Sequence, residues 1–286
     1  MIRLTHIGGP TLLVEVGGWR ILTDPTFDPP GDRYAFGWGT GSTKLAGPAI
    51  AATDLGAVDA VLLTHDHHAD NLDAAGRALL ADVPVVVTTT AGARRLGHDG
   101  AVGLEPWATT RLDAPGRDPI DVVATPCRHG PPLTRPIVGH VVGFSLTWPG
   151  QTRGALWISG DTVLHRDLWQ VTDRVDVGVA ILHLGGVRFP ITGPARYTMT
   201  IDDAVELCGR LRPHTAIPVH YEGWSHFQQG RDAIEERLAT APAATREAFR
   251  FLPFGDPVDV APLSRPDDNT REIPGLSRGR PGYGGC

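Results

Sequence analysis

Residues 64–73, with the sequence Thr-His-Asp-His-His-Ala-Asp-Asn-Leu-Asp, restrict the fold more than any other stretch of the chain. They follow the apolar run 58–63, which is typical of a buried strand, and precede residues 74–80, which predict the start of a helix. Side chains on such a strand-to-helix turn point off the end of a sheet. Imidazole nitrogens and carboxylate oxygens at this spacing are the ligands that a divalent transition metal requires. The alternative, a polar loop in which Asn71 or Asp73 caps the helix, explains three histidines in four residues less well.

Composition and charge exclude several classes of protein. A chain of 286 residues can form one large domain or two small ones, and 41% hydrophobic with 20% charged residues is typical of globular proteins. The net charge of −6 comes without a basic block, which argues against a nucleic-acid partner. No apolar run approaches the roughly 20 residues that span a membrane. We therefore expect a globular protein with neither nucleic acid nor membrane as its partner.

The cysteines and the start of the chain indicate a cellular compartment. Cys127, Cys208 and Cys286 lie far apart and are odd in number, which does not predict a disulfide framework and is consistent with a reducing environment. The chain passes from Met1 directly into a strand pattern, without the charged and apolar regions of a signal peptide. These features predict a cytoplasmic protein.

Strand and helix patterns alternate along both halves of the chain, without a fixed-period repeat or an obvious linker. This alternation predicts an α/β protein with a two-sheet core, in which residues 1–261 form one domain. Residues 262–286 are polar and rich in Pro, Gly and Arg, and predict a tail that lies across the surface or a partner subunit, or is poorly ordered. The long aromatic segment 25–50 predicts a lid or pocket wall around Trp38, the alternative being a loop that packs its own small cluster.

One local pattern recurs at the ends of the predicted strands. An imidazole or a carboxylate follows an apolar strand closely at each of five places: His65, His129, Asp161, His183 and His220. The carboxyl ends of strands collect ligand sites in α/β folds, and such groups can hold two metal ions about 3.5–4 Å apart. Ordinary explanations compete, because Asp161 could cap a helix over residues 163–171 and a structural role is favoured for His183. The remaining histidines, His226 among them, have no such partners in the sequence.

These motifs resemble a known family. Residues 64–73, His129, the Gly-Asp-Thr run 160–162 and the Pro-Val-His run 218–220 are similar to the metallo-β-lactamase fold superfamily of metallohydrolases. Residues 5–9 and 21–25 are similar to its L-ascorbate-6-phosphate lactonase-like branch. The resemblance covers residues 1 to about 255. It implies an αββα sandwich of two mixed β-sheets flanked by helices, with one or two metal ions at one edge, most often zinc and sometimes manganese or iron.

The sequence departs from the family run His-x-His-x-Asp-His, because one residue is inserted and the last histidine is lost. Aligned from the front, His65 and His67 are the first pair and Asp70 stands at the last histidine. Aligned from the following Leu-Asp, His68 is the second histidine, Asp70 keeps the aspartate position and Asn71 replaces the last histidine. The sequence does not choose between these alignments. In both, the second metal ion has lost a nitrogen donor, so either one or two ions are expected.

The resemblance implies a metal-dependent hydrolase. A bound zinc ion lowers the pKa of its water to about 7, and the resulting metal-bound hydroxide would attack an ester, lactone, amide or phosphodiester of a small molecule. The expected metal ligands are His65, His67 or His68, and His129 for the first ion, Asp161 as a bridge, and Asp70 and His220 for the second. Asp66 or Asp70 would orient the water or carry protons.

Further residues are expected to bind the substrate. Trp38, Tyr221 and Trp224 would shape the pocket, and Arg128 or Arg188 would pair with an anionic group. The lost histidine motivates an alternative, a degenerate metal-binding member with a binding or regulatory role and no hydrolysis. Redox chemistry at an iron pair is a third reading, which is less favoured because no flavin or rubredoxin-like module is visible. The sequence leaves the substrate and the oligomeric state open, a homo-oligomer included.

Overall fold

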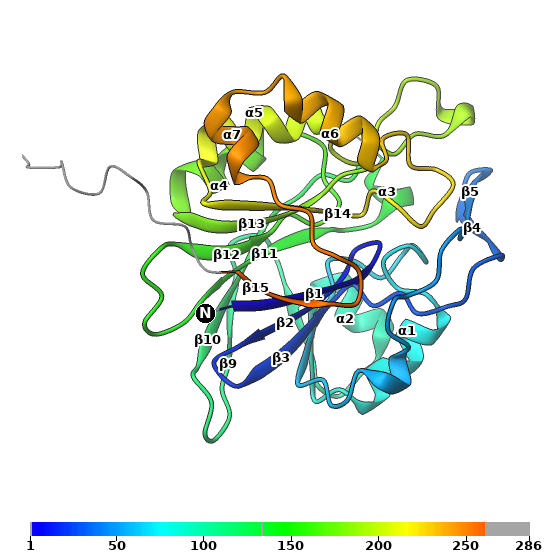
Figure 1. The fold of residues 1–286 in the computed structure, drawn as a ribbon. Coiled ribbons are helices and arrows are strands. Elements are labelled where there is room, and N and C mark those ends of the chain that lie inside the picture. Colours follow the sequence, from blue (N-terminus) through cyan, green and yellow to red (C-terminus); the bar gives the residue numbers. More distant parts are fainter. Residues whose placement is uncertain (1, 133, 261–286) are drawn as a thin grey trace, which may run out of the picture.

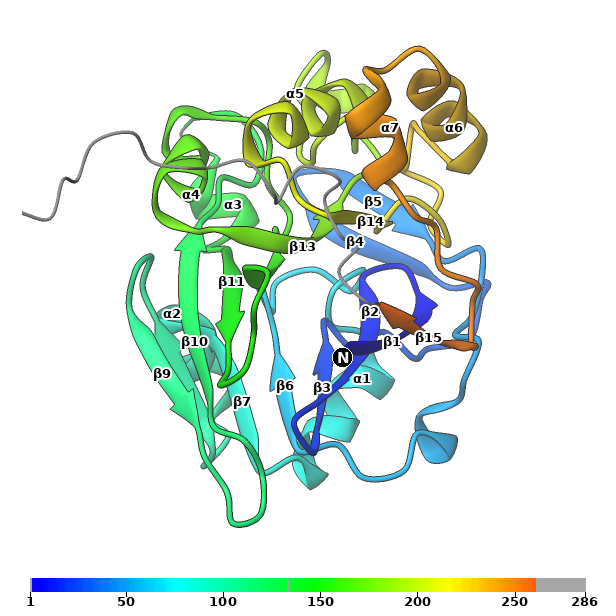
Figure 2. The same ribbon diagram turned by 60° about the vertical axis from the view of Figure 1, so that its left-hand side comes forward.

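The structure, a computed structural model, describes residues 2–132 and 134–260. Two β-sheets lie face to face, and helices cover the outer face of each (Figures 1 and 2). This is the αββα sandwich of mixed sheets that was expected, so the predicted fold class is confirmed. The predicted tail, residues 262–286, lies outside the described residues, and the domain boundary at residue 261 therefore stays a prediction. Within the described ranges, no helix is both long and apolar enough to cross a membrane.

The first sheet combines an antiparallel meander with a parallel half. Its described strands are, in spatial order, β15 (Pro257–Val260), β1 (Ile2–Gly8), β2 (Thr11–Val16), β3 (Trp19–Thr23), β6 (Ala60–Leu62), β7 (Val85–Thr89) and β8 (Ala101–Leu104). The turn between β2 and β3 needs Gly17 and Gly18, whose φ angles of 56° and 82° are strained for other residues. Strands β3, β6, β7 and β8 run parallel, so their carboxyl ends meet at one edge.

The second sheet brings the other strand ends to the same place. Its described strands are, in spatial order, β14 (Thr215–Val219), β13 (Val177–His183), β12 (Ala155–Ile158), β11 (Val142–Thr147), β10 (Ile120–Pro126) and β9 (Thr109–Leu112). Strands β12, β13 and β14 are parallel, and β10 shares their direction because it and β12 both pair antiparallel with β11. The residues that follow β10, β12, β13 and β14 consequently emerge at one edge.

Apolar side chains fill the space between the sheets and beneath the helices. Fully buried residues such as Leu62 on β6 and Phe144 on β11 belong to one cluster between the two sheets. A second cluster joins β13 to the helices of its outer face, and a third lies between the first sheet and residues of α1 and the following turn. The described helices are α1 (Ala74–Leu79), α2 (Thr90–Leu96), α3 (Arg135–Val138), α4 (Trp169–Arg174), α5 (Ile201–Leu211), α6 (Arg231–Ala239) and α7 (Ala243–Ala248).

Two expected helices begin later than the sequence patterns suggested. Residues 163–165 are not helical; a 3₁₀ turn at Arg166–Leu168 precedes α4. The reason is that the Val163 N–H donates to the Arg128 carbonyl, 2.9 Å away, so that this segment lies against the loop after β10. The sequence also predicts a last helix over residues 226–239, and this helix likewise begins only at Arg231, after Gly230.

The segment 25–50 contains a β-hairpin that was not expected, β4 (Arg33–Gly37) and β5 (Thr40–Thr43). Immediately after β5, the Lys44 side chain is buried and its Nζ lies 2.7 Å from Asp73 Oδ2, at the N-cap of α1. This ion pair connects the hairpin to the turn that carries the histidines.

Candidate metal centre

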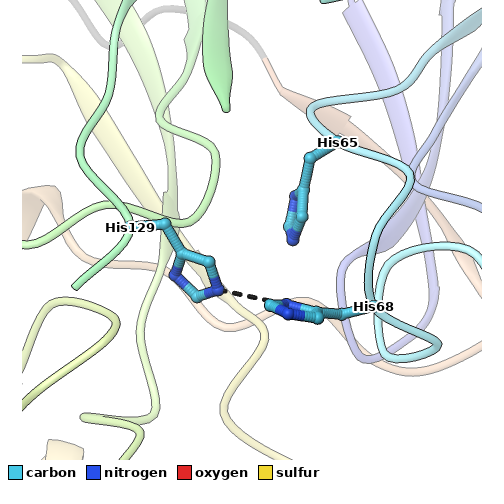
Figure 3. Close-up of side chains that lie close together, drawn as sticks. All are labelled: His65, His68 and His129. Atoms are coloured by element: carbon cyan, nitrogen blue, oxygen red, sulfur yellow. Dashed lines mark hydrogen bonds between the residues drawn. The ribbon is translucent and has the colours of Figure 1, made fainter. Parts of the chain in front are cut away.

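Three histidines form a first cluster where the two sheets meet. His65 and His68 lie on the turn after β6, and His129 lies on the loop after β10. All three are buried, and His129 Nε2 lies 3.2 Å from His68 Nδ1. Figure 3 shows these two nitrogens facing one another, with the His65 ring directed toward the space beside them. The cluster therefore joins residues that are 61 positions apart in the sequence.

The hydrogen bonds of this cluster leave nitrogen lone pairs available. His129 Nδ1 donates to the Tyr197 carbonyl oxygen at 2.8 Å, so the neutral ring carries its lone pair on Nε2. His65 Nε2 is buried without a hydrogen-bond partner among the described residues. Burial and neighbouring imidazoles lower the pKa of His68 to about 3 and hold the pKa of His65 well below its ordinary value. Neutral imidazole is the form that binds a metal ion.

A second cluster lies beside the first and contains Asp70, Asp161 and His220. His220 Nε2 is 3.4 Å from Asp70 Oδ2, and His220 Nδ1 is 3.3 Å from Asp161 Oδ1. Asp161 follows β12 and His220 follows β14, where its φ of 55° places a non-glycine residue in the left-handed region. Such strain is typical of functional sites.

The two carboxylates of this cluster have different environments. Burial and the charges of Asp70 and Asp24 raise the pKa of Asp161 well above its ordinary value. Burial also acts to raise the pKa of Asp70, but the close imidazoles of His220 and His226 outweigh it and hold that pKa well below its ordinary value. Within the described residues, neither Asp161 oxygen has a hydrogen-bond partner. A cation between these groups would relieve the repulsion.

The distances and donor types fit divalent metal ions. In each cluster the ligand atoms lie within 4.8 Å of one another. Zinc–nitrogen and zinc–oxygen bonds of about 2.0–2.2 Å in a tetrahedron place neighbouring ligand atoms about 3.3 Å apart. The separations of 3.2 Å between His68 Nδ1 and His129 Nε2 and of 3.4 Å between His220 Nε2 and Asp70 Oδ2 are close to that value, whereas Asp161 Oδ1 lies 3.3 Å from the other ring nitrogen of His220. Each cluster can thus hold one ion.

Asp24, which the sequence patterns did not single out, contacts the start of the turn that carries His65 and His68. Its Oδ1 accepts hydrogen bonds from the backbone N–H and the hydroxyl of Thr64, at 2.7 and 3.0 Å. Its Oδ2 lies 3.3 Å from His183 Nε2. His183 is therefore paired with Asp24, in line with the structural role that was favoured for it. The signal for Asp24 was its position at the end of β3, next to β6 in the sheet.

The structure places His67 and Asp66 outside both clusters. Arg95 on α2 contacts both side chains, with its Nε 2.9 Å from Asp66 Oδ2 and its Nη2 3.1 Å from His67 Nδ1. The turn therefore directs His68, rather than His67, toward His65 and His129. This arrangement keeps the strand-end histidine of one alignment and the second histidine of the other.

Aromatic residues surround a small cavity beside the clusters, with a volume of about 40 Å³. Its walls include His68, Asp70 and His129 and the aromatic residues Phe36, Trp38, Phe189 and Tyr197. Trp38, at the tip of the β4–β5 hairpin, is 77% exposed. The predicted pocket wall in segment 25–50 is therefore found at Phe36 and Trp38.

The other expected substrate-binding residues lie elsewhere. Trp224 is buried behind the cavity, 5.1 Å from the ring of Tyr34, and Tyr221 packs against Phe251 at 5.7 Å. Arg128 lines a larger cavity of about 460 Å³ on the other side of His129. Arg188 is exposed and lines none of the described cavities.

His226 lines the small cavity, although its sequence context gave it no ligand role. Its Nε2 lies 3.0 Å from Asp70 Oδ2, and its ring is buried. The available signal was that His226 shares the loop after β14 with His220.

Comparisons with known proteins agree with this geometry. The chain is 24% identical to a UPF0173 metal-dependent hydrolase of Pyrobaculum aerophilum, with 91% of this chain and 100% of that protein covered. It is 28% identical to a UPF0173 metal-dependent hydrolase of Thermofilum pendens, with 91% and 99% covered.

Solved structures share the fold. An isothiocyanate hydrolase from Delia radicum gut bacteria superposes with a TM-score of 0.73 at 21% identity, over 90% of this chain and 98% of that one. A metallo hydrolase from Ignicoccus hospitalis gives a TM-score of 0.66 at 22% identity, over 90% and 97%. The family described as "Beta-lactamase superfamily domain" matches residues 19–221, a range that includes all six residues of the two clusters. The chain belongs to the β-lactamase superfamily domain family.

Proposed function

We propose that this protein is a metal-dependent hydrolase that cleaves an ester, lactone, amide or phosphodiester of a small molecule. The observation that carries the proposal is the pair of adjacent, buried clusters, in which His65 Nε2, both Asp161 oxygens and both His220 nitrogens have no hydrogen-bond partner among the described residues. The relatives from Pyrobaculum aerophilum and Thermofilum pendens, both named metal-dependent hydrolases, support it. The lactonase-like branch inferred from the motifs stays a prediction.

Zinc is the proposed metal, with one or two ions per chain and manganese or iron as alternatives. Three imidazoles suit zinc or iron, whereas a set with two carboxylates accepts harder ions as well. When bound, such ions act as Lewis acids and lower the pKa of coordinated water. His65, His68 and His129 would hold the first ion, and Asp70, Asp161 and His220 the second, with Asp161 as the bridge.

Asp70 is proposed to orient the attacking water. Its pKa is held well below the ordinary value, so its carboxylate is charged at neutral pH, and it lines the small cavity. Asp66 is proposed as a positioning residue instead, because its carboxylate is engaged by Arg95 and holds the turn that presents His68.

The proposed substrate has a compact apolar part and an anionic group. Phe36, Trp38, Phe189 and Tyr197 would contact the apolar part in the small cavity, with Trp224 behind them. Arg128 has a buried Nε without a partner in the described part of the chain, and it lines the larger cavity next to His129. We propose Arg128, rather than Arg188, as the partner of the anionic group. Tyr221 would support the loop of His220 from within the core.

Location and partners are proposed from the same features. A cytoplasmic location is consistent with Cys127 and Cys208, which are both free thiols. The net charge of −6 supports the absence of a nucleic-acid partner. A homo-oligomer stays a prediction, which sedimentation velocity would measure.

The alternative, a degenerate metal-binding protein without hydrolysis, is motivated by Asn71, which stands where the resemblance implies a histidine. Metal content distinguishes the two, because about two ions per chain favour hydrolysis and none favours the degenerate reading.

The test combines metal content with hydrolysis of a lactone, a β-lactam, a phosphodiester and a thioester. Asp161→Asn keeps the size of the side chain but removes its charge, and we expect it to lower metal content and to reduce hydrolysis by about 100-fold or more. Asp121→Asn is the matched control, because Asp121 is an exposed carboxylate on β10. If Asp161→Asn leaves both measurements unchanged, the proposal is wrong.

A further inference from the structure

The family resemblance implies a further histidine ligand for the second ion, and in one of the two alignments Asn71 stands at its position. Asn71 is fully buried, and its Nδ2 donates to Thr64 Oγ1 at 3.4 Å. Its amide nitrogen has no lone pair to offer a metal ion. The group of Asp70, Asp161 and His220 therefore offers a metal ion two carboxylates and a single imidazole.

His226 approaches this cluster from the loop after β14. Its Nε2 lies 3.0 Å from Asp70 Oδ2, close to the separation expected for two atoms that bind one ion. Despite this distance, Nε2 is buried and makes no hydrogen bond of acceptable geometry within residues 2–132 and 134–260. A nitrogen aimed beside its neighbour, rather than at it, is what two ligands of a common ion require.

The other ring nitrogen of His226 is held in place. His226 Nδ1 lies 2.6 Å from Ser42 Oγ on β5, and that hydroxyl is also 3.2 Å from Ser225 Oγ. Ser42 can accept from Nδ1 and donate to Ser225, which leaves the lone pair of His226 on Nε2. Phe189 stacks on the ring, with a centroid distance of 5.6 Å and an interplanar angle of 12°. Metal-binding histidines are commonly oriented by such partners of their second nitrogen.

We propose that His226 Nε2 binds the second metal ion together with Asp70, Asp161 and His220. His226 then supplies a second nitrogen donor beside His220, from a different loop than the one that carries Asn71. The inference rests on the proposed function only in assuming that the two clusters hold metal ions. Ser42 is a positioning residue in this arrangement, and the β4–β5 hairpin thereby contacts the metal centre directly.

Cobalt titration tests the assignment without measuring catalysis. Co²⁺ absorbs in the visible range when it is bound, and its stoichiometry is checked by elemental analysis after dialysis. We expect two Co²⁺ per wild-type chain, whereas His226→Ala keeps the first and binds the second about 100-fold more weakly. His98→Ala is the matched control, because His98 lies in the turn between α2 and β8, and it is expected to titrate as wild type. His226→Gln provides a variant with a bulky polar side chain, with the same expected loss.

The outcomes separate this inference from the proposed function. Retention of the first Co²⁺ shows that the His226 variants fold. Two Co²⁺ bound with wild-type affinity in both variants would overturn the inference and leave the metal centre itself intact. A single Co²⁺ in the wild-type protein would also overturn it, while a mononuclear hydrolase would remain. No Co²⁺ in the wild-type protein would overturn both.

Discussion

Asp161 illustrates how a residue can serve a bound ion and oppose folding in its absence. Burial, followed by the charges of Asp70 and Asp24, raises its pKa well above the ordinary value. A carboxyl group with a raised folded-state pKa destabilises the folded protein increasingly as pH rises from its unfolded value of about 3.9 through the folded value. The carboxylate is retained where a cation compensates for it.

The first prediction follows from this electrostatic cost. In metal-free protein at pH 8, Asp161→Asn should raise the melting temperature by several degrees, since 1 kcal/mol corresponds to about 2–4 °C for a chain of this size. The gain should shrink as pH falls, because Asp161 then takes up a proton. Differential scanning calorimetry with and without chelator measures both effects. A metal-free variant that melts below wild type at pH 8 would contradict the argument.

Histidine pKa values lead to the second prediction, on metal affinity. Burial first, and then nearby imidazoles, lower the pKa of His68 to about 3, and burial lowers that of His220 to about 4. Protons therefore compete with a metal ion for these nitrogens only near those values, and not near the ordinary 6.5. We therefore expect the zinc affinity of the first cluster, in which all three ligands are imidazoles, to change little between pH 8 and about pH 5. Competition with an indicator whose own pH dependence is known provides the measurement, and a decline with its midpoint near pH 6.5 would refute it.

For single residues, the sequence predicts which side chains at strand ends belong to the site, but it does not predict contacts between loops. The positions of His65, His129, Asp161 and His220 could be read from the strand ends, because parallel strands deliver their ends to one edge. The pairing of His226 with Asp70 could not be read, since the two lie 156 residues apart. The choice between His67 and His68 depended on Arg95, which contacts the turn from 28 residues further along the chain.

The β4–β5 hairpin is the element whose role changed most between sequence and structure. Its strands, Arg33–Gly37 and Thr40–Thr43, are short and each has only one buried residue, so no alternating apolar pattern marked them. Lys44, the only lysine of the chain, holds the hairpin through its buried ion pair with Asp73. Three backbone N–H groups also donate to the Asp73 carboxylate. The hairpin is thus attached to the same turn that carries the histidines.

The third prediction concerns this ion pair. Lys44→Met removes a charge whose side chain is only 3% exposed, and leaves the fully buried Asp73 unpaired. Breaking one side of a buried pair costs about 3–5 kcal/mol, so the urea midpoint should fall clearly. Arg3→Met provides the control, because its pair with Asp259 is exposed to solvent, and we expect it to change the urea midpoint little. Equal losses for the two variants would show that burial of the Lys44 pair does not matter.

In the whole molecule, the candidate metal centre lies where the strand ends of the two sheets meet. Each cluster draws ligands from both: His65, His68 and Asp70 follow β6 of the first sheet, whereas His129, Asp161 and His220 follow strands of the second. The sandwich could be predicted because strand and helix patterns alternate and the motifs fall at strand ends. Which strand ends of the two sheets meet could not be predicted, because this depends on how the faces of the two sheets pack.

The last prediction tests whether a metal ion connects the sheets. An ion that binds only the folded protein stabilises it by about 2.7 kcal/mol at 100 times its dissociation constant, so chelator should lower the melting temperature. Because each cluster has ligands from both sheets, hydrogen exchange should slow on metal addition at the ends of both β6 and β14. Mass spectrometry of exchange in wild type and in His129→Ala provides the comparison, since that variant removes the contribution of the second sheet to the first cluster. Protection confined to one sheet in the wild-type protein would mean that the clusters bind metal without joining the two halves of the sandwich.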